Sequence, residues 1–158
     1  MPAITPKASY HAVLPPLASR FVDVDALPWE SHPNYPGIES KVLVVDPSSG
    51  MLTMLMRMAP GAVLPEHEHV LVEQTFVIEG SLMCGEGECT AGQFVWRPAG
   101  SRHKAWGGPR GGLMVAMFQM PNRFFKTDGT VTDYMGNDWA KTWGAALERH
   151  EQAQFETN

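Results

Sequence analysis

The sequence predicts an all-β fold, a sandwich or barrel of short strands, from two features of residues 41–120. Short apolar runs recur there, including KVLVV, MLTMLMRM, VLVEQTFVI and GLMVAMFQM. Turn sequences rich in glycine, proline, aspartate or serine separate them, among them DPSSG, APGA, GEGE and GGPRGG. Short strands divided by turns at this spacing are typical of antiparallel all-β domains. With 158 residues, the chain can form one such domain with a sizeable core.

Residues 1–36 are expected to form a proline-rich arm ahead of the barrel, which we place at residues 37–125. Prolines interrupt the start of the arm repeatedly, so no regular structure is predicted there. Near its end, Trp29 and Tyr35 lie among further prolines. Side chains of this size predict that the arm packs on another surface.

Residues 126–158 are expected to add a β element and a short C-terminal helix that pack on the barrel. Asp128-Gly129 is a favourable hairpin turn. Asn137 can cap a helix over GNDWAKTWGAALERH, although Gly144 lowers the helix propensity. The helix would present an apolar face formed by Trp139, Trp143, Leu147 and His150. We expect this face to pack on the barrel, and a dimer contact is the alternative.

The charge and hydropathy of the chain argue against two classes of partner. The net charge is −5, and no run of lysine or arginine offers the basic stripe that nucleic-acid binding needs. No apolar stretch approaches the roughly 20 residues of a membrane helix. The N-terminus lacks a charged segment followed by an apolar block, so it does not resemble a signal peptide. We expect a cytoplasmic protein without nucleic-acid or membrane partners.

Cys84 and Cys89 are the two cysteines of the chain, in the segment CGEGEC. Two cysteines are too few for a zinc ribbon or a disulfide scaffold. They flank a predicted hairpin turn, so a bridge between them is sterically conceivable. In a reducing compartment we expect free thiols.

The segment PEHEHVLVEQ predicts a metal site. His67 and His69 are two residues apart, so on a strand both imidazoles point to the same face. Glu73 can return on the neighbouring strand, and His103 follows a turn at residues 98–100. Neutral imidazoles and a carboxylate suit iron, manganese, nickel or zinc without discriminating sharply among them. A metal-free cluster of solvated histidines is the alternative.

Two stretches of the chain resemble the two conserved motifs of the cupin superfamily. Gly61 to Gly80 follows the pattern GX5HXHX3EX6G, and Gly92 to His103 follows GX5PXGX2H, with Gly107 in place of the usual asparagine. The resemblance implies a double-stranded β-helix, the RmlC-like jelly roll. It also implies one divalent metal ion with open coordination positions, held by His67, His69, Glu73 and His103.

The whole-chain plan resembles small single-domain dioxygenases that cleave acetylacetone or dihydroxyacetophenone. This implies Fe2+ on His67, His69 and His103, with Glu73 either a ligand or adjacent to the ion. The implied reaction is cleavage of a carbon–carbon bond in a small apolar diketone or hydroxyaryl ketone by O2. The motif region also resembles the zinc-binding cupin domain of anti-sigma factors. A non-catalytic Zn2+ sensor or ligand-binding cupin is therefore one alternative, and a cupin isomerase is another, with Ni2+ or Mn2+ as further possible ions.

Substrate contacts are expected on the inner face of each strand. Val63 and Pro65 share the parity of the histidines, and other strands offer Gln74, Met83, Trp96, Trp106, Met117 and Gln119. These side chains are mostly apolar, which suits a ketone better than a sugar. A jelly roll also leaves strand edges that proteins tend to cover. We therefore expect a homodimer.

Overall fold

A computed structural model gives the structure of the protein and describes residues 5, 19–46, 49–119 and 122–132. These residues form ten strands and no helix, so no helix among them could cross a membrane. The strands are β1 (Glu30–Ser31), β2 (Ile38–Asp46), β3 (Met51–Met58), β4 (Val63–His69), β5 (Glu73–Cys84), β6 (Gly87–Thr90), β7 (Phe94–Arg97), β8 (Arg102–Gln119), β9 (Asn122–Phe125) and β10 (Val131–Thr132).

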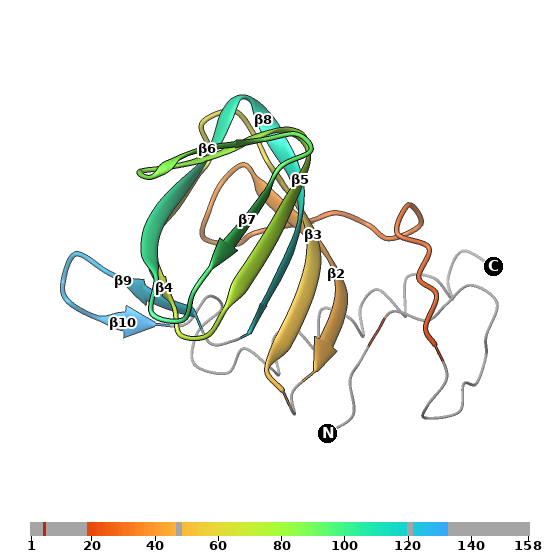
Figure 1. Cartoon of the computed structure of the whole chain (residues 1–158), viewed down its shortest axis with the longest axis horizontal. Helices are drawn as coiled ribbons and strands as arrows, with labels where there is room; N and C mark the ends of the chain where they lie inside the picture. The colour runs from red at the N-terminus through yellow and green to blue at the C-terminus, as the bar shows by residue number, and fades with distance from the viewer. Residues whose placement is uncertain (1–4, 6–18, 47–48, 120–121, 133–158) are drawn as a thin grey trace.

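The strands form one curled antiparallel sheet, in which the long strand β8 pairs with β3, β4 and β5 (Figure 1). The order is β1-β2-β3-β8-β4-β9-β10, and β5 pairs with β6, β7 and β8. The first part of β8 pairs with β4 and its second part pairs with β3, so this strand connects the part of the barrel that contains β4 with the part that contains β3. The all-β jelly roll predicted from the sequence is thereby confirmed.

The predicted turns form hairpins where the described residues cover them. Cys84 pairs with Gly87 across the GEGE turn. β9 and β10 pair across Asp128-Gly129, where Gly129 has a φ of 83°. β2 and β3 pair across DPSSG, of which residues 47–48 lie outside the described part. Turn residues that favour a positive φ thus mark these hairpins correctly.

Residues 19–36 of the arm pack on the barrel. β1 adds a short strand to β2, and Leu27 is buried. Tyr35 stacks on Phe124 with ring centroids 5.6 Å apart, while the Arg57 guanidinium lies 4.2 Å from the centre of the Trp29 ring. The packing predicted for Trp29 and Tyr35 is therefore present. The predicted C-terminal helix from Asn137 onward lies outside the described residues.

The core lies inside the barrel and is made of alternate residues of the long strands. The fully buried side chains include Leu52 and Met54 of β3, Val77 of β5 and Met114 of β8. Residues i and i+2 of a strand share one face, so a period of two buries one face of each strand and leaves the other toward solvent. The same period decides which polar side chains enter the barrel.

Gly80→Ala is expected to destabilise the protein by about 3 kcal/mol, because two costs combine. Gly80 has a φ of +64°, and an added Cβ would clash with the carbonyl oxygen of Gly111. The matched control is Gly92→Ala, where φ is +83° but no atom lies within 4 Å of the added Cβ. That variant should be destabilised only by the unfavourable positive φ of its alanine, at a cost of about 1 kcal/mol. Urea denaturation of both variants measures the difference, and equal losses would contradict the role of the close approach.

Candidate metal centre

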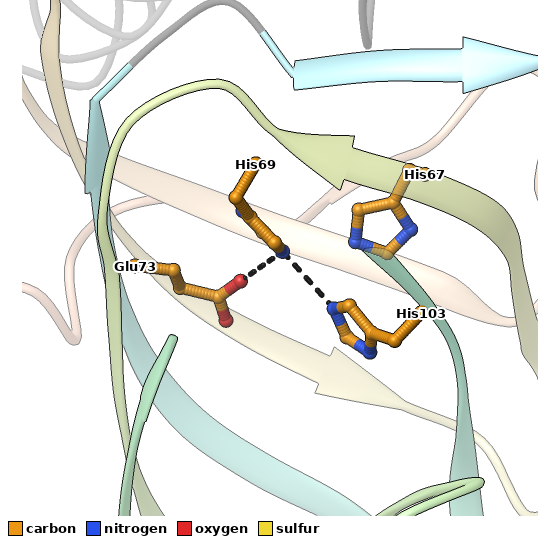
Figure 2. A group of neighbouring side chains, drawn as sticks. All are labelled: His67, His69, Glu73 and His103. Carbon is orange, nitrogen blue, oxygen red and sulfur yellow. Dashed lines mark hydrogen bonds and ion pairs between the residues drawn. The ribbon is translucent and has the colours of Figure 1, made fainter. Parts of the chain in front are cut away.

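Four side chains from three strands meet inside the barrel (Figure 2). His67 and His69 come from β4, Glu73 begins β5, and His103 lies near the start of β8. His67 pairs in register with His103, which brings the two strands together at the site. All four residues are at most 8% exposed. The two-residue spacing of the β4 histidines therefore directs both rings inward, as the sequence predicted.

The nitrogen and oxygen atoms of the four side chains converge. Nε2 of His69 lies 3.0 Å from Nε2 of His103 and 2.6 Å from Oε2 of Glu73. One such atom from each of the four residues lies within 4.8 Å of the others. A cluster of this kind could hold one metal ion.

Burial keeps the imidazoles in the form that binds metals. It lowers the pKa of His67 to about 4 and that of His103 to about 3. Burial alone would raise the pKa of Glu73, but hydrogen bonds from His69 and Thr75 and the charge of Arg97 bring it down to about 2. At neutral pH, His67 and His103 are therefore neutral and Glu73 is a carboxylate, which are the forms that coordinate a cation.

Neighbouring groups orient two of the candidate ligands. The His67 Nδ1 lies 2.9 Å from the Pro65 carbonyl oxygen, so its proton is donated there and Nε2 keeps a free lone pair. Phe124 stacks on the His67 ring at 4.9 Å between centroids. The Thr75 hydroxyl donates to Oε1 of Glu73 at 2.6 Å. These contacts hold the His67 ring and the Glu73 carboxylate in place before any ion binds.

Thr75→Val is expected to weaken metal binding by about tenfold or more, the usual cost of losing a group that orients a ligand. Valine keeps the shape of threonine but leaves Oε1 of Glu73 without its donor. The matched control is Thr53→Val, on the outer side of β3, which should leave the affinity unchanged. Competition of each variant with a chelator for Zn2+ measures the change. An unaltered affinity for Thr75→Val would mean that Glu73 needs no orientation from this hydroxyl.

A cavity of about 40 Å³ lies beside the four side chains. Apart from Asn122, its remaining walls are apolar and come from Met54, Met56, Leu64, Leu82, Ala105, Ala116, Phe118 and Phe124. A cavity that admits benzene measures about 150 Å³, so this one is small. It offers room for an ion and a few further atoms, and the flexible Met54 and Met56 side chains can enlarge it.

The six residues expected to contact substrate lie elsewhere. They are Gln74, Met83, Trp96, Trp106, Met117 and Gln119. None lines this cavity, and each stands next to an inward-facing residue, beside Glu73, Leu82, Arg97, Ala105 or Phe118. A one-residue error in parity turns every side chain to the opposite face. Gln74 pairs with both Trp96 and Met117, Met83 pairs with Trp106, and Gln119 donates to the Ser49 carbonyl.

A register irregularity explains why Val63 and Pro65 do not line the cavity. The pairing of β4 with β8 shifts between Leu64 and His67, so Leu64 and His67 both face inward although they are three residues apart. Val63 is 39% exposed instead. A β-bulge of this kind changes the parity within one strand, and no local pattern in the sequence marks it.

Several residues of the site were not found from the sequence. Thr75 lies two residues after Glu73 on the same strand, so its inward direction follows from the period of two. Asn122 and Phe124 of β9 reach the site because β9 pairs with β4, at His69 and His67 respectively. That pairing joins segments more than 50 residues apart, and only the tertiary structure shows it.

The fold is shared with solved cupin structures. A candidate acetylacetone dioxygenase from Methylibium petroleiphilum PM1 matches with a TM-score of 0.70 and 24% identity, over 80% of this chain and 95% of that chain. The acetylacetone dioxygenase from Acinetobacter johnsonii matches with a TM-score of 0.68 and 20% identity, over 89% and 96%. At these identities the likeness shows the fold alone.

The fold also occurs in a regulatory complex. The complex of Rhodobacter sphaeroides SigE with the anti-sigma ChrR matches with a TM-score of 0.51 and 17% identity, over 61% of this chain and 51% of that chain. No curated protein matches the sequence. The sequence model of the ChrR cupin-like domain matches residues 18–123, well over half of the chain. This protein therefore belongs to the ChrR cupin-like domain family.

Proposed function

We propose that this protein is a metal-dependent oxygenase that cleaves a carbon–carbon bond of a small diketone or hydroxyaryl ketone. The observation that carries the proposal is the buried group of three histidines and one glutamate beside an apolar cavity. The shared fold of acetylacetone dioxygenases supports the substrate class. The proposed ligands are His67, His69, Glu73 and His103.

The donor set fits a divalent metal ion. The Nε2 atoms of His69 and His103 are 3.0 Å apart, and one nitrogen or oxygen atom from each of the four residues lies within 4.8 Å of the others. In addition, Nε2 is the atom through which His69 and His103 contact each other, and Nδ1 of both rings is buried without a hydrogen-bond partner among the described residues. Bound Fe2+ would supply Lewis acidity toward the substrate oxygens and redox chemistry toward O2.

The residues of the chain divide the remaining tasks. Glu73, with a pKa of about 2, is a weak base, so it is suited to hold His69 and balance charge rather than to remove a substrate proton. Leu64, Phe118 and Phe124 exclude water from the centre. With a divalent ion and the Glu73 carboxylate, the site would keep one positive charge, and a diketone that enters as its enolate would neutralise it. The apolar walls would accept the alkyl groups of the diketone.

The size of the cavity favours the smallest substrates of the proposed class. A volume of about 40 Å³ is too small for an aromatic ring without movement of Met54 or Met56. An aliphatic β-diketone needs a smaller displacement than a hydroxyaryl ketone. We therefore expect acetylacetone to be accepted before dihydroxyacetophenone.

The test is O2 consumption by protein reconstituted anaerobically with Fe2+. The iron-loaded protein should consume equimolar O2 with acetylacetone and release two small products, whereas the zinc-loaded protein should consume none. His32→Ala, which removes an imidazole outside the site, should keep the activity. If iron binds with the expected affinity but no diketone or hydroxyaryl ketone supports O2 consumption, the site is a metal centre and the oxygenase proposal is wrong.

A non-catalytic zinc-binding role is the second candidate. The match to the ChrR cupin-like domain and the small cavity favour it, because a sensor needs no room for a substrate. Elemental analysis of protein purified without chelator separates the two roles. Near-stoichiometric iron would support the oxygenase, and near-stoichiometric zinc would support the sensor.

The proposed homodimer has support from the outer face of the sheet. Phe76, Phe94, Trp96 and Met117 are between 36% and 57% exposed. They adjoin across β7, β5 and β8, because Phe76 pairs with Phe94 and Gln74 pairs with both Trp96 and Met117. Contiguous exposed apolar patches of this kind mark interaction surfaces. Light scattering gives the mass in solution, and a monomeric mass would contradict the proposal.

A further inference from the structure

A second group of reactive side chains lies outside the metal centre, on the hairpin of β5 and β6. Cys84 and Cys89 are free, half-buried thiols. Cys84 pairs with Gly87 and Cys89 pairs with Leu82, so the two cysteines are diagonal neighbours on one face of the hairpin. Both line an open hollow of about 460 Å³ together with Glu86, Phe94 and Arg97. The metal centre uses neither thiol.

Arg97 forms the floor of this hollow. The residue is only 4% exposed, yet it carries a charge that requires partners. Its Nη2 donates to the Cys84 sulfur at 3.6 Å, and its Nη1 donates to Oε2 of Glu86 at 2.9 Å. Its Nε is buried without a partner among the described residues. A fixed guanidinium beside one thiol and not hydrogen-bonded to the other makes the two sulfurs chemically different.

We propose that Cys84 and Cys89 form an oxidisable dithiol site, in which hydrogen peroxide oxidises Cys84 first and Cys89 then closes a disulfide. Arg97 favours Cys84 as the first sulfur, because a donor at the sulfur stabilises the negative charge that develops during attack. Burial raises the pKa of the Cys89 thiol, which keeps it protonated and makes it the less reactive sulfur toward peroxide in the first step. The site takes a small oxidant that the open hollow admits.

The two steps balance. The Cys84 sulfur attacks one oxygen of peroxide, an S–O bond forms as the O–O bond breaks, and water leaves. Sulfur is oxidised by two electrons and peroxide is reduced by two. The Cys89 sulfur then attacks the Cys84 sulfenic acid, an S–S bond forms as the S–O bond breaks, and the hydroxyl leaves as water with the Cys89 proton. In total, two thiols and one peroxide give one disulfide and two waters.

The disulfide requires a change of register in the hairpin. Diagonal neighbours have Cα atoms about 7–8 Å apart. A disulfide needs less than about 7 Å. Sliding β6 by two residues pairs Cys84 directly with Cys89 across a four-residue loop and keeps every side chain on its original face. β6 has four residues and pairs only with β5, so few hydrogen bonds oppose the shift (Figure 1).

The experiment treats the metal-free protein with hydrogen peroxide, blocks remaining thiols, and follows intact mass and digested peptides. Wild-type protein should lose two hydrogens and give one linked peptide pair containing Cys84 and Cys89. Cys89→Ser should stop at a sulfenic acid that dimedone labels at Cys84. Arg97→Gln should slow the first step about tenfold, the loss of one hydrogen bond to a charged group. The matched control Arg102→Gln, at an exposed arginine, should leave the rate unchanged.

Three results would overturn the proposal. The first is no oxidation at peroxide concentrations that oxidise a free cysteine peptide. The second is dimedone labelling of Cys89 in Cys84→Ser at the rate seen for Cys84 in Cys89→Ser. The third is disulfides only between molecules. The metal-free protein is used throughout, so the result does not depend on the proposed oxygenase activity.

Discussion

His69→Ala is expected to lower the affinity for Zn2+ or Fe2+ by at least about a hundredfold. Four-ligand zinc sites have binding free energies of about 10–16 kcal/mol, so one ligand accounts for roughly 3 kcal/mol, or two orders of magnitude. His69 should exceed this share because its Nε2 contacts both Glu73 and His103. Without the ring, the carboxylate and the second imidazole lose the group that brings them together.

The measurement is titration calorimetry with chelator competition, at neutral pH, on His69→Ala and on two further variants. His32→Ala should bind metal as the wild type does, because His32 lies outside the centre and stacks on Tyr35. Glu73→Gln keeps the size of the side chain and removes its charge, so it should weaken binding less than His69→Ala does. A His69→Ala protein that binds metal normally would show that the ion does not occupy this cluster.

The spacing of polar residues predicted the site because the relevant strand segments are short. Between His67 and His69 only one residue intervenes, so the period of two holds whatever the rest of β4 does. His103 was found through its position after a turn that ends at Gly100, which has a φ of 82°. Spacings of one to five residues were therefore enough to predict that these histidines point into the barrel.

The cavity walls could not be predicted in the same way, because parity must be extended over whole strands. The register of β4 against β8 shifts between Leu64 and His67, and that of β5 against β8 shifts twice, around Val77 and Gly80. Each shift can exchange the inner and outer faces. The residues expected as pocket walls face the outer side, and Trp96, on the regularly paired β7, is 57% exposed. Arg97, one residue further on, is the side chain that enters the protein.

The metal-free protein is expected to lose stability as the pH falls from about 6.5 to about 4. The folded protein holds His67 with a pKa lowered by burial to about 4, whereas the unfolded chain protonates this imidazole near pH 6.5. Between these values the unfolded state binds more protons, so acid favours unfolding. The difference of roughly 2.5 pKa units corresponds to about 3 kcal/mol for His67 alone.

His103 and Glu73 act in the same direction. The pKa of His103 is lowered to about 3, and because the two rings share one site their contributions overlap rather than add. The pKa of Glu73 is lowered to about 2, so its contribution is present above pH 4.5 and is lost as the pH falls toward 2. The steepest loss above pH 4 should therefore come from the histidines.

Urea denaturation with excess chelator at pH 7, 6, 5 and 4 measures this dependence. A His67→Gln/His103→Gln variant should lose more than half of the slope between pH 6.5 and 4, because its glutamines do not titrate. His32→Ala should keep the slope. With stoichiometric zinc the wild type should gain most stability at pH 7 and least at pH 4, since protons compete with the ion for the same nitrogens.

A metal-free protein equally stable at pH 7 and pH 4 would mean that the imidazoles are protonated as readily in the fold as in the unfolded chain. The cluster would then be a solvated group of histidines, and its fitness to receive a cation at neutral pH would need another explanation.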